Sequence, residues 1–492
     1  MPPVATVPDG ADEPGVSTPA TNGPVPVPEL AEPDPGQATV SWRECGGVIA
    51  AGLAATPPPA GLPVDCASVP SVLDSPAGRG RTEIELLRIG TGPIPLVVVT
   101  DIDGTPGTLA AARLAASMPP AVLAKFSLVG VDRRGTGVSD PISCLPLSTR
   151  LAMLESDPAS ADFDGWLADA STAGQKCSIA LENRLPVLDT WRTAADLDVV
   201  RDALGTDRLN AIGRGEGSRV LIVYAERFPD RVGRLVLDGV PDPTHDATIM
   251  LDGAAAGAEA ALTAFAADCV SRACPLGADP RQTIITLLAR LRTGPLDGPE
   301  GLQLTAGAAL RALQIGLTDR TGWPALADAL TAAGAGDPTG LNALIAPLVT
   351  DSGQHVPEFD IALVTGCNDT RTRASTAQVV RSLTTWQSRY PVFGALRAQW
   401  LAWCAPWPIP AQPLPALTAP GTPPIVVLGT SADPLTPGAG TERAARQLAT
   451  ATLVTWQGAG HGALGRSSCA TEAAAAFLLT AKLPRDDTAC PP

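Results

Sequence analysis

The sequence predicts an α/β protein in which a mostly parallel sheet carries helices on both faces. Short apolar runs rich in Val, Ile and Leu alternate with segments of helical period, as in buried parallel strands and their covering helices. Strand-like runs return near residue 424 after a long Ala-rich stretch, which indicates one sheet interrupted by an insertion. The 492 residues are enough for one large core carrying such an insertion, or for more than one core.

Six apolar runs are the candidate strands of this sheet. They span residues 94–102, 126–132, 208–213, 232–237, 424–429 and 452–457. Between the second and third runs, apolar residues recur every three or four positions over 190–204, which predicts a helix. Another helix is expected to begin at Gly217 and to run through SRVLIVYAERF.

The strand signal fades from about residue 244 to about residue 415, where Ala-rich helical segments dominate. We interpret residues 244–415 as a helical lid. It is inserted before the strand at 424–429, which leads to Asp433, and it separates two parts of the core, 39–243 and 416–492. Residues 1–38 are rich in Pro, acidic and small residues without periodicity, so we expect a disordered linker there.

Charge and hydropathy argue against two kinds of partner. The chain has 35 Lys and Arg against 50 Asp and Glu, and this formal charge of −15 has the wrong sign for holding a phosphate backbone. No run reaches the roughly 18 consecutive apolar residues that a membrane span needs. We therefore expect neither a nucleic-acid partner nor a transmembrane segment.

Ten cysteines fall into neighbours along the chain. The pairs are Cys45 with Cys66, Cys144 with Cys177, Cys269 with Cys274, Cys367 with Cys404, and Cys469 with Cys490. No pair has the spacing or the neighbouring histidines of a zinc site, so five local disulfides are favoured over buried free thiols. We expect no metal, no cofactor, and a secreted or cell-envelope location. Met1 is followed by PPVATVPDG, which lacks the features of a signal peptide, so a mature or trimmed chain is expected.

Three of the expected strand ends share the layout of a Ser-Asp-His hydrolase. Residues 213–217 (GRGEG) lie between a strand and a helix, and they have the shape of a nucleophile elbow centred on Gly215. Asp433 follows a later strand, where its carboxylate can orient an imidazole, and His461 follows the last strand in a Gly-His-Gly turn. The order of elbow, acid and histidine along the chain is that of the hydrolase fold.

A further motif, residues 132–139, reads DRRGTGVS and matches the pattern D-x-R-G-x-G-x-S. Together with the elbow, the Asp433 loop, the Gly-His-Gly turn and the cysteine placement, it makes the sequence resemble actinobacterial secreted α/β-hydrolases similar to tripeptidyl aminopeptidases and proline iminopeptidases. The resemblance runs from about residue 40 to the C-terminus. It implies an α/β-hydrolase fold with a lid, and a peptide or small acyl compound as substrate or ligand.

The elbow departs from the family pattern G-x-S-x-G, because Gly215 has no side chain to attack a carbonyl. Ser218 is expected in the first turn of the following helix, where its hydroxyl is misplaced for attack. The expected oxyanion donors are the backbone N–H groups of Glu216 and Thr105, and Thr105 stands where the family usually carries glycine. The Glu216 carboxylate is also a candidate ligand for a substrate amine.

Two functions stay open at this point. The first is a catalytically disabled hydrolase that keeps the Asp433–His461 pair and binds a peptide or acyl ligand. The second is an active secreted peptidase or esterase, in which Gly215 is an engineered change or another nucleophile acts. The remaining candidates are interpreted structurally: His245 and His355 as loop residues, Asp101 and Asp103 as a solvated turn, and Trp400, Trp403 and Trp407 as lid packing.

Overall fold

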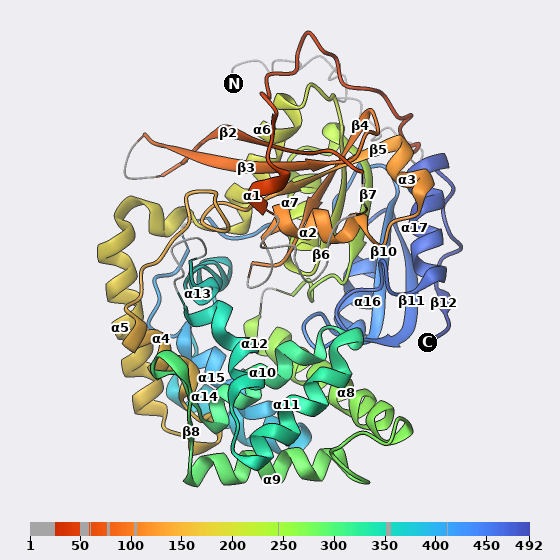
Figure 1. The fold of residues 1–492 in the computed structure, drawn as a ribbon. Coiled ribbons are helices and arrows are strands. Elements are labelled where there is room, and N and C mark those ends of the chain that lie inside the picture. The colour runs from red at the N-terminus through yellow and green to blue at the C-terminus, as the bar shows by residue number, and fades with distance from the viewer. Residues whose placement is uncertain are drawn as a thin grey trace, which may run out of the picture.

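A sheet covered by helices on both faces forms the upper half of the molecule in Figure 1, and a region made mostly of helices lies below it. The computed structural model describes residues 25–49, 59, 61–75, 79–102, 106–244, 246–350, 356–410 and 412–492. The sheet has ten strands among these residues. The mostly parallel α/β architecture predicted from the sequence is confirmed.

The strands lie side by side across the sheet in an order that differs from their order along the chain. From one edge to the other they are β1 (Arg43–Glu44), β2 (Val64–Val72), β3 (Arg81–Ile89), β5 (Phe126–Val131), β4 (Ile94–Val99), β6 (Leu209–Arg214), β7 (Val232–Asp238), β10 (Ile425–Ala432), β11 (Ala451–Ala459) and β12 (Thr488–Cys490). The pairs β1–β2, β2–β3 and β3–β5 are antiparallel, and the other pairs are parallel. The six predicted strands are β4 to β7, β10 and β11, with ends shifted by at most a few residues.

Each face of the sheet has its own hydrophobic core. One face is covered by α2 (Gly107–Ala115), α3 (Pro120–Lys125) and α17 (Ser468–Thr480), and the other by α6 (Thr190–Ala203), α7 (Glu216–Arg227) and α16 (Gly438–Gln447). All residues of β4, β5 and β7 are buried, as expected for strands covered on both faces. Helix α6 lies where the apolar period predicts it, and α7 begins one residue before the expected Gly217.

Most of the helical region lies between β7 and β10 in the sequence. Its elements are α8 (Ala247–Ser271), α9 (Pro280–Thr293), β8 (Leu296–Asp297), β9 (Gln303–Leu304), α10 (Ala306–Leu317), α11 (Trp323–Ala335), α12 (Thr339–Val349), α13 (Glu358–Asp369), α14 (Thr376–Arg389) and α15 (Gly394–Trp403). Trp403 and Trp407 are buried in this region, as the prediction of packing requires. The remaining short helices are α1 (Gly46–Ile49), η2 (Pro158–Ser160), η3 (Glu182–Val187), η4 (Pro229–Arg231), η5 (Pro299–Gly301) and η6 (Arg320–Gly322).

Two earlier helices also belong to the helical region, α4 (Leu147–Glu155) and α5 (Phe163–Leu181). Their apolar faces share one hydrophobic cluster with α10, α13 and α15. The buried guanidinium of Arg150 in α4 pairs with Asp360 of α13 at 2.6 Å. The expected assignment of all of residues 39–243 to the core is therefore wrong for α4 and α5. Their apolar faces pack against helices of the helical region and not against the sheet.

All ten cysteines form disulfides, in the five pairs expected from their spacing. Cys45–Cys66 joins the start of α1 to β2, and Cys469–Cys490 joins α17 to β12. The other three bridges lie in the helical region or at its border. The alternative of buried free thiols is not supported.

Residues 25–38 contain no helix or strand, yet they lie against the core. Leu30 packs beside the sheet face that α17 covers, and the backbone carbonyl of Pro28 accepts hydrogen bonds from Arg234 at 3.0 and 3.2 Å. The expectation of a disordered linker is therefore wrong for residues 25–38. They have no periodic apolar pattern, but contacts with the core hold them in place. Residues 1–24 lie outside the described part of the chain.

Helix α8 is long and apolar enough, by length and composition alone, to cross a membrane. No single apolar run in the sequence indicated this, because Asp252, Glu259 and Asp268 interrupt the helix. One side of α8, including Leu262 and Phe265, is buried in the core of the helical region. Burial of one side only is typical of a helix that covers a hydrophobic core.

Candidate active site

The turn between β6 and α7 has the geometry of a nucleophile elbow. Gly215 has φ 54° and ψ −123°, a conformation that residues with a Cβ adopt only under strain. A Cβ at Gly213 would lie 2.7 Å from the Cα of Ser218, and a Cβ at Gly217 would lie 2.1 Å from the carbonyl oxygen of Val99. The outer glycines therefore permit the close approach of strand and helix that the sequence predicts.

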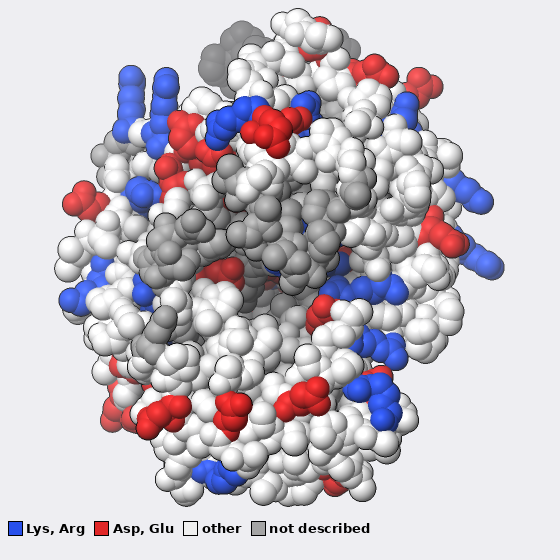
Figure 2. Space-filling model, in the orientation of Figure 1, with Lys and Arg blue, Asp and Glu red and all other residues white. Residues whose placement is uncertain are grey.

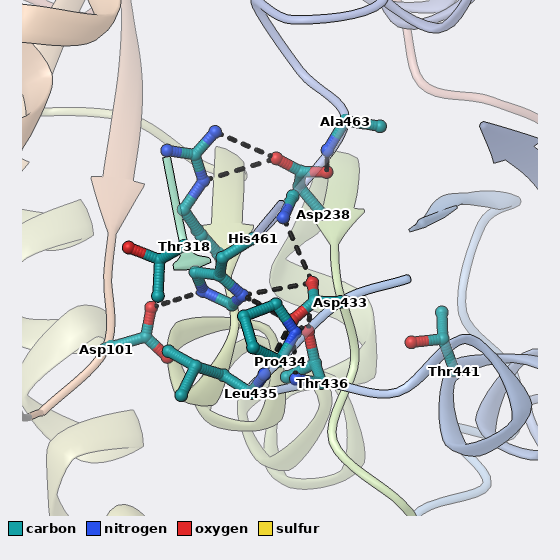
Figure 3. Close-up of polar contacts among 12 residues, drawn as sticks. Asp101, Asp238, Thr318, Asp433, Pro434, Leu435, Thr436, Thr441, His461 and Ala463 are labelled. Atoms are coloured by element: carbon teal, nitrogen blue, oxygen red, sulfur yellow. Dashed lines mark hydrogen bonds and ion pairs between the residues drawn. The ribbon is translucent and has the colours of Figure 1, made fainter. Parts of the chain in front are cut away.

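Asp433 and His461 meet beside this turn, as the order of motifs predicts. The Nδ1 atom of His461 lies 3.0 Å from both carboxylate oxygens of Asp433 (Figure 3). Asp433 is fully buried, and one of its oxygens accepts hydrogen bonds from the backbone N–H groups of Leu435 and Thr436 at 2.8 Å. The backbone N–H of His461 donates to the carbonyl of Thr318, which follows α10, so the helical region helps to fix the ring.

On the other side of the ring lies Asp101, two residues after the end of β4. Its Oδ2 is 2.8 Å from the Nε2 of His461 (Figure 3). Its Oδ1 accepts a hydrogen bond of 2.9 Å from the backbone N–H of Glu216. A Cβ built on Gly215 would lie only 1.9 Å from this Oδ1. The carboxylate of Asp101 therefore occupies the space that a serine side chain at position 215 would need.

The interpretation of Asp101 as part of a solvated turn is wrong. Only 14% of its side chain is exposed, because strand β4 lies next to β6 and its end faces the elbow. The sequence shows only an acid at the end of an apolar strand, and the neighbouring turn at Gly215 is more than 100 residues away. Asp103, the other acid of that expected turn, lies outside the described residues.

The two carboxylates keep His461 charged. Burial alone would lower the pKa of His461, but the charges of Asp433 and Asp101 outweigh it and raise the pKa to about 10. Burial alone would raise the pKa of each carboxyl, but the charge of His461 holds both below their usual values. At neutral pH the three side chains therefore form an ion triad, in which the imidazolium donates from both ring nitrogens.

The other expected site residues either have partners within the protein or lie outside the described part of the chain. The Glu216 N–H, an expected oxyanion donor, already binds Asp101, and the Glu216 carboxylate pairs with Arg219 at 3.1 Å. Ser218 is fully buried and donates to the carbonyl of Gly213 at 2.9 Å, so its hydroxyl lies within the turn. Thr105, the second expected oxyanion donor, lies outside the described residues, as do His245 and His355.

Residues 132–139 form the loop that follows β5, and hydrogen bonds within and around it fix its shape. The buried guanidinium of Arg134 binds both oxygens of Asp196 at 2.6 and 2.7 Å. The hydroxyl of Ser139 donates to the carbonyl of Asp132 at 2.8 Å, and burial raises the pKa of the Asp132 carboxyl to about 6. The contacts of this motif are therefore structural, with the exception of those made by Arg133, which faces a cavity.

Two cavities of about 260 and 1150 Å³ lie next to the triad. Asp101, Trp400 and Leu435 line both of them, and His461 lines the larger one. Residues of the sheet half and of the helical region contribute to each wall, and Figure 2 shows that the surface is hollowed between the two halves. A ligand in either cavity would lie beside Asp101.

Two family models match parts of the chain. A family model described as alpha/beta hydrolase fold matches residues 104–294, and one described as TAP-like protein matches residues 390–490. A solved hydrolase from Pseudomonas aeruginosa PA01 is similar with a TM-score of 0.35 at 17% identity, covering 84% of this chain and 98% of that one.

Relatives with curated names match over most of the chain. Serine protease Hip1 of Mycobacterium tuberculosis (strain ATCC 25618 / H37Rv) is 28% identical, covering 94% of this chain and 92% of the relative. Tripeptidyl aminopeptidase of Streptomyces lividans is 29% identical over 75% and 71%, and carboxylesterase B of M. tuberculosis is 29% identical over 86% and 85%. By its fold and these matches, the chain is an α/β-hydrolase-fold protein of the TAP-like, peptidase and esterase type.

Proposed function

We propose that the protein binds a peptide or small acyl ligand and has lost the serine chemistry of its relatives. The observation that carries this proposal is the 1.9 Å between Oδ1 of Asp101 and a Cβ built on Gly215. The attacking hydroxyl is absent, and an ionised carboxylate fills its place. The same carboxylate takes the hydrogen bond of the Glu216 N–H, which would otherwise be free for the oxygen of a substrate carbonyl.

The state of His461 supports the same conclusion. A general base has to be unprotonated when it accepts a proton, and the raised pKa of about 10 keeps His461 protonated at neutral pH. Serine hydrolases stripped of their triad retain only about 10³ to 10⁴ over the uncatalysed rate, from binding and the oxyanion hole. With the oxyanion donor also occupied, we expect even less hydrolysis from this protein.

Labelling with a fluorophosphonate tests the proposal, because the probe reacts only with an activated serine. We expect no labelling of the wild-type protein and little of Gly215→Ser, because the new side chain displaces Asp101 from its hydrogen bonds. The double variant Gly215→Ser/Asp101→Ala frees the space and returns His461 towards a basic state, so it should be labelled. Gly215→Ala/Asp101→Ala is the matched control without a hydroxyl, and labelling of the wild-type protein would overturn the proposal.

If another nucleophile replaces the serine, the candidate is Asp101. Among the described residues, its Oδ2 is the side-chain oxygen within hydrogen-bond distance of the Nε2 of His461. Both oxygens of this carboxylate accept hydrogen bonds, from His461 and from the Glu216 N–H, which lowers its reactivity. Intact mass after incubation with an alkyl epoxide distinguishes the two functions. A covalent adduct that is absent from Asp101→Asn would favour the bypass over ligand binding.

Two further expectations remain part of this proposal. Residues 244–415, together with α4 and α5, act as a lid over the cavities, which is supported by their share in both cavity walls. The protein works outside the cytoplasm or in the cell envelope, which is supported by the five disulfides and by the similarity to Hip1. Tryptic cleavage of the helical region that a bound ligand slows would support a lid.

A further inference from the structure

Three buried arginines stand out because they lack a counterion. Eight arginines are buried among the described residues, and five of them pair with a carboxylate, namely Arg134, Arg150, Arg192, Arg201 and Arg219. Within the described part of the chain, Arg133, Arg234 and Arg311 have no carboxylate oxygen within 4.0 Å. A buried charge without a counterion is costly, so each of the three needs a physical reason.

Hydrogen bonds to backbone carbonyls account for two of the three. Arg234 donates to the carbonyls of three residues at 2.7 to 3.4 Å and lines neither cavity. Arg311 donates to two backbone carbonyls and to the side chain of Gln399, and it lines the larger cavity. Both guanidinium groups are therefore well solvated by the protein.

Arg133 has almost no such solvation. Its single hydrogen bond within the described residues is a long one of 3.4 Å to the hydroxyl of Thr190, and its Nε and Nη1 have no partner there. The side chain is 3% exposed and lines the smaller cavity. A guanidinium stays protonated at neutral pH even when burial lowers its pKa, so this wall of the cavity carries a positive charge.

Most of the other charged groups around the smaller cavity have partners of their own. Glu216 pairs with Arg219, Asp242 with Arg443, and Asp101 with His461. Asp369, the acid that acts most strongly on Arg133, accepts hydrogen bonds from Thr190, and burial raises its pKa to about 7. Arg397 donates to the carbonyl of Pro434 and has further contacts. Arg133 therefore has no carboxylate oxygen within 4.0 Å among the described residues and keeps two nitrogens without a hydrogen-bond partner there.

From this arrangement we infer that the smaller cavity binds a carboxylate with a short apolar chain, and that the carboxylate pairs with Arg133. Apolar side chains and several threonines line the rest of the cavity, and the apolar ones include Met250, Leu251, Leu401 and Leu414. The volume of about 260 Å³ suits a chain of a few carbons. The inference rests on the proposed function, because it names the chemical class of the ligand, and it disfavours an amine bound by Glu216.

Isothermal titration with matched six-carbon probes tests the inference at neutral pH and low salt. Hexanoate should bind the wild-type protein at least about tenfold more tightly than hexan-1-ol, because it alone pairs with the guanidinium. Hexan-1-amine, with the opposite charge, should bind more weakly still. Equal affinities of hexanoate and the amine would overturn the inference.

Substitution of Arg133 separates a binding role from a structural one. In Arg133→Met, hexanoate affinity should fall at least about tenfold, while the melting temperature without ligand stays the same or rises, because an uncompensated charge is gone. Arg234→Met is the matched control, since it is also buried and without a counterion. It should keep hexanoate affinity and lose stability with its hydrogen bonds.

Unchanged hexanoate affinity in folded Arg133→Met would overturn the inference. If that variant does not fold, Arg133→Lys and the selectivity of the wild-type protein among the three probes decide instead, because lysine keeps the charge and loses the paired donors. Failure of this inference and failure of the proposed function are distinguishable. Fluorophosphonate labelling tests the loss of serine chemistry, whereas probe binding tests the chemical class of the ligand.

Discussion

The two nitrogens of the His461 ring have different surroundings: the Nδ1 side resembles a hydrolase site, and the Nε2 side does not. On the Nδ1 side, Asp433 is fully buried and is held by the backbone of its own loop. On the Nε2 side, where a serine hydroxyl belongs, the ring meets the carboxylate of Asp101. Under the proposed function, the orienting half of a triad persists without the attacking half, because the former is built into loop hydrogen bonds and the latter depends on one side chain.

We expect the largest effect from removing Asp433, which binds the Nδ1 side of the ring. Asp433→Ala leaves three backbone N–H groups and a buried imidazolium without their acceptor, so it should lower the free energy of unfolding by about 3–5 kcal/mol. Asp101→Ala removes an acceptor for two donors and should cost about 1–3 kcal/mol. Urea unfolding measures both, and equal costs would contradict the comparison. Asp252→Ala, which breaks an exposed pair with Arg389, is the control and should cost about 1 kcal/mol or less.

The second effect is a dependence of stability on pH. The pKa of His461 rises from 6.5 to about 10 on folding, so its contribution is complete below pH 6.5 and is lost as the pH rises through about 10. The free energy of unfolding should fall by about 1 kcal/mol per pH unit in this window. In Asp101→Asn the fall should begin at the same pH, because the unfolded state sets the onset, but it should end at a lower pH, because the folded pKa of His461 loses the contribution of Asp101. A histidine NMR titration of the wild-type protein with a midpoint near 6.5 would contradict the ion triad.

The third effect is a coupling between positions 215 and 101. Gly215→Ala should cost about 1–3 kcal/mol, because a Cβ displaces the carboxylate and strains the backbone. The cost should be smaller in the background of Asp101→Ala, and a double-mutant cycle should give a coupling of about 1–2 kcal/mol. Strictly additive costs would show that the two side chains do not compete for one space.

The smallest effect concerns Ser218, whose hydroxyl lies within the elbow. Ser218→Ala removes one buried hydrogen bond and should cost about 1 kcal/mol. Combined with Gly215→Ser/Asp101→Ala, it should leave fluorophosphonate labelling unchanged. Loss of labelling in that triple variant would make Ser218 the reactive serine.

The central strands were predictable because each is buried on both faces and reads as a continuous apolar run. Strands β2 and β3 alternate buried and accessible residues at the edge of the sheet, so no such run marks them. Helices α4 and α5 precede β6 in the sequence, so they are predicted to belong to the core. Only their contacts with α10, α13 and α15 assign them to the helical region, and the sequence does not show these contacts.

The candidate site was predictable where a local pattern carries it. Glycines on both sides mark the turns of Gly215 and His461, and a strand end followed by Pro and Thr marks Asp433. The position of Asp101 is not local. It depends on contacts with Glu216 and His461, which are 115 and 360 residues away in the sequence. A solvated turn and a buried member of an ion triad look alike until the neighbouring strand is known.

A crystal structure of the wild-type protein at neutral pH would show whether Asp101 occupies the place of a serine side chain at position 215. We expect the carboxylate of Asp101 between the backbone N–H of Glu216 and the Nε2 of His461, at about 2.9 and 2.8 Å, with no room for a side chain at Gly215. Solvent in that position, with Asp101 turned away from the ring, would contradict the account.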